Sequence, residues 1–156
     1  MKRIATVALA SCFFVASAQA QNFELEPTFE TVTLATGFEG SNHQVTVVAG
    51  GPIDASELGG ECAGFIADAP DVRVNFTAGS NKFAFGAVSE SDTTIVVNAP
   101  DGEWYCDDDS WGDGDPLVVF DQPESGQYDI WVGTFDEGDN PRASLGIMEL
   151  TAGSKN

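Results

Sequence analysis

The chain has 156 residues, of which 25 are acidic and 6 are basic, and its formal net charge is −19. A surface this acidic repels nucleic acid and anionic membranes, so partners of both classes are excluded. Apolar residues make up 42% of the sequence, which is enough to fill one hydrophobic core and predicts one folded domain.

The first 20 residues have the pattern of a secretory signal peptide. Two basic residues precede an apolar run over 4–16, and the small residues Ala18 and Ala20 fit a signal-peptidase site. The run is too short to span a membrane, so we expect cleavage near Ala20 and export to the periplasm or beyond. A lipoprotein anchor at Cys12 is the alternative, but it would leave an unusually short apolar core before the cut.

Cleavage at this site changes both the charge and the cysteine count. It leaves four basic residues against 25 acidic ones, a net charge of −21. Cys62 and Cys106 become the only cysteines, and a lone pair in an exported protein most simply forms a disulfide. The two residues lack Cys-x-x-Cys spacing, which favours a structural role over a redox role.

Strand-like segments follow one another through the mature chain. Residues 21–28 form an irregular lead-in, one helical turn is expected at 55–58, and 151–156 form a polar tail. Alternating, β-branched segments separated by Gly, Pro and Asp predict strands at 29–38, 43–49, 72–76, 82–88, 93–98, 103–106, 117–120, 128–134 and 143–150. The sequence therefore predicts an all-β, single-domain, antiparallel, jelly-roll-like β-sandwich over 29–150.

Three motifs in the second half of the chain resemble a known family. They are Asp-Thr-Thr-Ile-Val-Val-Asn-Ala-Pro-Asp-Gly from Asp92, Asp-Asp-Asp-Ser from Asp107, and Pro-Glu-Ser-Gly-Gln-Tyr-Asp-Ile-Trp-Val-Gly-Thr-Phe from Pro123. Together they resemble the bacterial pre-peptidase C-terminal (PPC) domain over 84–150. The resemblance implies an exported, jelly-roll-like sandwich, and relatives of that family in collagenases bind calcium and matrix. We expect no peptidase domain before the module, which would depart from the family's usual setting.

An acidic loop between two predicted strands is a candidate calcium site. Crowded carboxylates repel one another unless a cation or water screens them, and calcium prefers six to eight oxygen ligands. Gly112 and Gly114 would let the chain wrap around an ion, although the pattern is not an EF-hand. A solvated loop without a metal is the equal alternative. The candidate ligands of a structural Ca²⁺ ion are Asp107, Asp108, Asp109, Asp113 and Asp115.

Trp104 and Trp111 flank this loop and the predicted disulfide. They either cover Cys62 and Cys106 or lie open as a stacking platform for a sugar or a partner chain. An open platform would make the chain a carbohydrate- or matrix-binding protein.

Catalytic machinery is not evident in the sequence. His43 is the only histidine, it falls in a predicted strand, and there is no Gly-x-Ser-x-Gly elbow. One histidine and a disulfide pair are also too few ligands for zinc. We therefore expect a non-catalytic, exported accessory or interaction module with a calcium-binding loop and a protein or glycan partner. A glycan-binding protein is the alternative, and a hydrolase ranks third.

Overall fold

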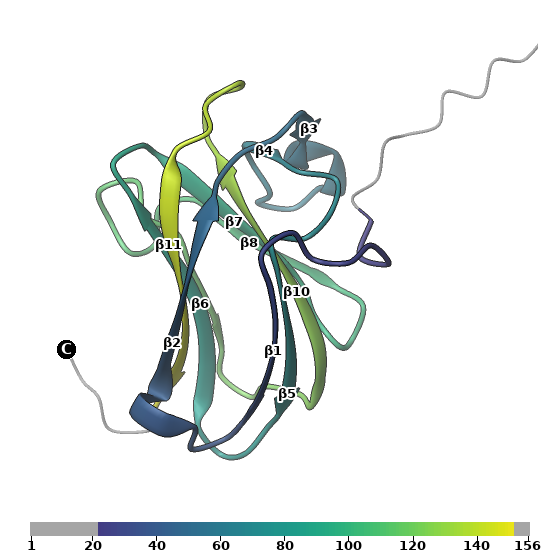
Figure 1. The fold of residues 1–156 in the computed structure, drawn as a ribbon, viewed down its shortest axis with the longest axis vertical. Helices are drawn as coiled ribbons and strands as arrows, with labels where there is room; N and C mark the ends of the chain where they lie inside the picture. Colours follow the sequence, from purple (N-terminus) through teal and green to yellow (C-terminus); the bar gives the residue numbers. More distant parts are fainter. Residues whose placement is uncertain (1–21, 152–156) are drawn as a thin grey trace, which may run out of the picture.

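The computed structural model of this chain describes residues 22–151. The predicted signal peptide and residues 152–156 of the predicted tail lie outside the described residues. Within the described range, two β-sheets pack face to face (Figure 1).

Sheet A has seven strands and sheet B has four. Sheet A contains β1 (Glu30–Ala35), β3 (Ile53–Asp54), β4 (Phe65–Ile66), β5 (Val72–Thr77), β7 (Thr93–Asn98), β8 (Trp104–Asp107) and β10 (Gly126–Thr134). Sheet B has the order β2 (Asn42–Val48), β11 (Arg142–Leu150), β6 (Lys82–Ser89) and β9 (Leu117–Phe120). Two 3₁₀ turns, η1 (Glu39–Ser41) and η2 (Ala55–Leu58), lie between strands, and η2 coincides with the predicted helical turn.

The predicted all-β, single-domain sandwich is confirmed, with two differences in detail. β1 pairs with β5 in parallel, from Glu30 opposite Val72 to Ala35 opposite Thr77, whereas every other strand pairing is antiparallel. After β1 the chain crosses to sheet B and then returns to sheet A for β5. Turn residues predict only pairings between strands that are consecutive in the chain, so they did not predict the pairing of β1 with β5. The short strands β3 and β4 were not predicted, because two residues are too few to show a period.

The main core lies between the sheets and is rich in aromatic side chains. The rings of Phe76 and Phe83 are stacked with their centroids 3.9 Å apart, and Phe83 also meets Phe85 and Tyr128 edge to face or nearly so. These side chains come from alternate positions of β5, β6 and β10. The alternation that predicted the strands is thus the alternation that fills the core.

A second, smaller apolar cluster lies on the outer face of sheet A. It contains Ile66, Val96 and Trp131, with Cys62 and Cys106 packed against it. The segment 49–67 covers this end of the sheet, which explains why β7 and β10 are buried on both faces. The predicted disulfide is present and joins that segment to β8.

The described part of the chain holds no helix that is long and apolar enough to cross a membrane.

Candidate functional site

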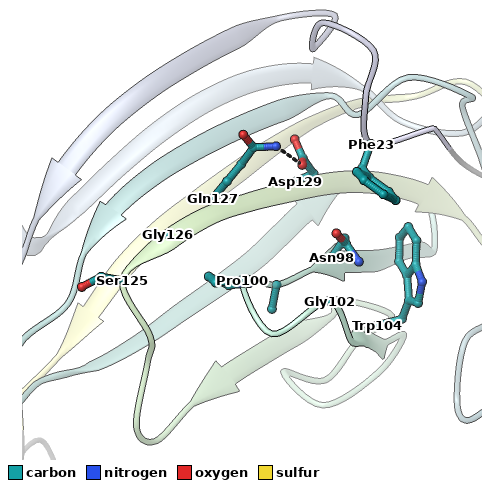
Figure 2. Close-up of a pocket in the computed structure, with 10 residues that line it drawn as sticks. Phe23, Asn98, Pro100, Gly102, Trp104, Ser125, Gly126, Gln127 and Asp129 are labelled. Atoms are coloured by element: carbon teal, nitrogen blue, oxygen red, sulfur yellow. Dashed lines mark hydrogen bonds between the residues drawn. The ribbon is translucent and has the colours of Figure 1, made fainter.

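A groove of about 450 Å³ runs along the outer face of sheet A (Figure 2). Its floor comes from Asn98 of β7 and from Gln127 and Asp129 of β10. Phe23 of the lead-in and Trp104 of β8 lie at one end. The groove therefore combines two aromatic rings with amide and carboxylate groups, in the size range of a small-molecule site.

The strand register places the polar groups of the floor side by side. In β10, Tyr128 and Ile130 point into the main core, so Gln127 and Asp129 point outward. Asp129 is directly opposite Asn98 of β7. Because both strands lie in the middle of the sheet, the backbone that carries these groups is rigid.

A network centred on Arg73 fixes the floor and one wall of the groove. The Arg73 Nε–H donates to Asp129 Oδ1 at 2.7 Å, and the Gln127 amide donates to Asp129 Oδ2 at 2.7 Å. Arg73 also donates from Nη2 to the backbone carbonyls of Phe23 at 2.6 Å and Leu25 at 2.9 Å. The Asp129 carboxylate is buried, and its ion pair with Arg73 neutralises its charge. The same guanidinium holds the lead-in beside the groove.

Trp104 is half-buried and links the groove to the second apolar cluster. Its ring centroid is 5.4 Å from that of Trp131, at an interplanar angle of 48°. It packs against the cluster that also takes up Cys62 and Cys106. Trp104 thus has one side fixed by packing, while the other borders the groove.

The groove has both hydrogen-bonding groups and apolar surface with which to hold a ligand. An amide that donates to Asp129 keeps its carbonyl oxygen as an acceptor and a second N–H as a donor. An aromatic ring offers an apolar surface at low entropic cost. Both carboxylate oxygens of Asp129 already accept a hydrogen bond, one from Arg73 and one from Gln127.

Within the acidic loop, Asp107 acts as the organising residue. Its carboxylate accepts from the backbone N–H of Ser110 at 2.9 Å and of Leu117 at 2.8 Å, and from the Ser110 hydroxyl. Asp115 closes the loop by an isolated bridge with Gly112, and Asp113 has a positive φ of 58°. The loop is therefore held by its own hydrogen bonds.

The predicted calcium ligands Asp108 and Asp109 lie near two carboxylates outside the acidic loop, those of Asp92 and Asp136. Partial burial, together with the negative charges of Asp109, Asp108 and Asp136, raises the pKa of Asp92. Three loops thus bring acidic groups to one end of the sandwich. Among residues 22–151, no group of three or more His, Cys, Asp or Glu side chains is arranged to hold a metal ion. Calcium binding stays a prediction.

The structure does not bring Trp104 and Trp111 together. Trp111 lies over Gly86 of β6, where a Cβ atom would be 2.7 Å from Trp111 Cζ3. The flanking Phe85 and Ala87 point into the core, so Trp111 covers the outer face of sheet B while Trp104 lies on the outer face of sheet A. The two tryptophans therefore do not form one shared platform, and a ligand-binding role for each stays a prediction.

His43 lies in β2, with its Nε2 atom 3.2 Å from Glu30 Oε1 of β1. This contact links the edge strands of the two sheets. It gives the only histidine of the sequence a structural neighbour.

The sequence patterns did not predict the groove residues Phe23, Asn98, Gln127 and Asp129. One signal was available, because Gln127 and Asp129 occupy alternate positions of β10, with Tyr128 and Ile130 at the positions that face the core. Such a pattern indicates an outward polar row. It does not reveal that Phe23, about a hundred residues earlier, lies beside that row.

No family model and no curated protein matches the chain, so the resemblance to the PPC domain stays a prediction. Among solved structures, the chain is similar to PliG from Aeromonas hydrophila, a periplasmic inhibitor of g-type lysozyme. The identity is 18%, the TM-score is 0.42, and the match covers 78% of this chain and 98% of that one. A similarity of this size assigns no function.

Proposed function

We propose that this protein is an exported, non-catalytic binding module, and that the groove beside Trp104 binds a neutral saccharide. The observation that carries the proposal is the pairing of aromatic rings with amide groups on rigid strands. A pyranose ring has apolar C–H faces that stack on aromatic rings and hydroxyl groups that exchange hydrogen bonds with amides.

The charge of the site favours a neutral ligand. Asp129 is neutralised by Arg73, while the protein as a whole is strongly acidic and repels anionic ligands. Gln127 and Asn98 supply hydrogen-bonding groups without a net charge. The disulfide supports export, since such bonds persist in oxidising compartments.

A glycan array followed by calorimetric titration tests this proposal. We expect binding to at least one neutral oligosaccharide, and a loss of about tenfold or more in affinity for Trp104→Ala, equivalent to ~1.4 kcal/mol. Because Trp104 also packs near the disulfide, Gln127→Ala serves as a second variant that leaves this packing intact. Trp111→Ala is the matched control on the other sheet and should bind as the wild type does.

Two results would count against saccharide binding. One is the absence of any neutral glycan ligand on the array. The other is unchanged affinity in both Trp104→Ala and Gln127→Ala, with both variants folded.

A further inference from the structure

The centre of the outer face of sheet B is built from small or apolar residues. The register places Gly86 of β6 directly opposite Gly146 of β11, and Val88 opposite Ser144. Ala84 faces Met148 in the same way. Since two glycines meet there, the centre of this face lacks the long polar side chains that usually cover a solvent-facing sheet.

Large apolar side chains are exposed toward one end of this face. Val48, Val88 and Trp111 are 43%, 47% and 49% exposed. A shallow depression of about 750 Å³ lies beside Val88, with Thr46 and Arg142 among its lining residues. Exposed apolar surface gathered in one place is characteristic of an interaction site.

The charge distribution around this face is uneven. The outward positions of β2, β6, β9 and β11 carry no acidic residue, although 25 acidic residues occur in the sequence. Glu90 lines the depression. Asp92 lies at the same end, within reach of the charges of Asp108, Asp109 and Asp136. The charged residues at the outward positions are basic, Lys82 at one end of β6 and Arg142 in the depression. A partly apolar surface is thus bordered by a rim in which Glu90, Asp92, Asp108, Asp109 and Asp136 outnumber Arg142.

We propose that the outer face of sheet B docks a basic polypeptide. Its apolar side chains would contact Val88 and Trp111, and its lysines and arginines would face the rim of Glu90 and Asp92. Complementary charge of this kind steers association and fixes orientation. A second copy of this chain is a poor occupant, because two molecules with a formal net charge of −19 repel each other.

Amide-detected NMR titration with two designed peptides tests the proposal. Both peptides are 18-residue amphipathic helices with the same leucine face, and the polar face is lysine in one and glutamate in the other. The lysine peptide should shift the signals of Thr46, Val88, Ser144 and the Trp111 indole, and the glutamate peptide should not. Binding should weaken as salt rises, because the rim is exposed.

Variants of one residue separate docking from general charge attraction. Val88→Asp places a charge on the exposed surface and should weaken binding of the lysine peptide about tenfold or more. Val88→Thr keeps the preference for strand and should give a smaller loss. Trp104→Ala lies on the opposite sheet and should change nothing, so this test is independent of saccharide binding.

Three outcomes would overturn the inference. The first is a set of shifts confined to the acidic loops, with none on β6 or β11. The second is equal binding of both peptides, or of neither at millimolar concentration. The third is a concentration-dependent dimer in sedimentation that Val88→Asp abolishes, which would make the face a contact between copies.

Discussion

Asp71 is a buried carboxyl group whose protonation affects stability. The side chain is 3% exposed and its Oδ2 atom accepts from the backbone N–H of Val132 at 2.7 Å. Burial raises its pKa from 3.8 to about 7, against the smaller opposing effect of that hydrogen bond. The folded state therefore holds the proton more tightly than the unfolded state does. The resulting stabilisation is complete below about pH 4 and is lost as the pH rises through 7.

Asp71→Asn should reduce the pH dependence of stability. Asparagine keeps an acceptor oxygen for Val132 but carries no charge, so the loss between pH 5 and pH 8 should shrink by a few kcal/mol, at ~1.4 kcal/mol per pKa unit. Thermal melts of both proteins across this range measure the effect. If the melting temperatures of the wild type and the variant changed equally with pH, Asp71 would not be the titrating group.

At the scale of elements, the loop between β8 and β9 combines structural and solvated carboxylates. Asp107 is engaged by Ser110 and Leu117, whereas Asp109 is exposed and lies close enough to raise the pKa of Asp92. A cation between these loops would relieve that repulsion. Asp92 and Asp136 therefore add to the negative charge around the predicted calcium loop.

Calcium should raise the melting temperature if this loop is a site. An extracellular site binds at roughly 10⁻⁴ to 10⁻³ M, so 10 mM calcium would add about 1.5–3 kcal/mol, or about 5 °C. Sodium chloride at equal ionic strength is the control for screening. Asp109→Asn should abolish the rise, and Glu39→Gln in η1 should keep it. An unchanged melting temperature in calcium would speak against metal binding.

At the scale of the whole molecule, the disulfide fastens the segment that covers the second apolar cluster to sheet A. Cys62 follows η2 and Cys106 lies in β8, so the bond ties segment 49–67 to the outer face of sheet A. That segment covers Trp131, which is fully buried. The loop it closes spans 44 residues.

Replacing both cysteines by serine should lower the free energy of unfolding by up to about 4 kcal/mol, since chain entropy is returned to the unfolded state. Urea unfolding of the double variant measures the loss. Thiol titration of the native exported protein should find no free sulfhydryl. Two free thiols, or equal stability of the double variant, would contradict this account.

The molecule's strands could be placed from sequence because their signals are local. Thr93–Asn98 and Leu117–Phe120 match the predicted bounds, and the other predicted strands differ at their ends by a few residues, while the two-residue strands β3 and β4 were not predicted. Alternation, β-branching and turn residues act over a handful of positions, so they survive in any tertiary context. The disulfide could also be predicted from sequence, because only one pair of cysteines follows the predicted cleavage site.

Tertiary structure alone decided which side chains meet. The groove joins Phe23, Asn98, Trp104 and Gln127 from four segments, and Trp104 and Trp111, seven positions apart, lie on opposite sheets. The parallel pairing of β1 with β5 and the meeting of Asp92 with Asp136 are also long-range. A local sequence pattern determines on which side of its strand a side chain lies. The distant side chains that it contacts there are determined by how the two sheets assemble around the core.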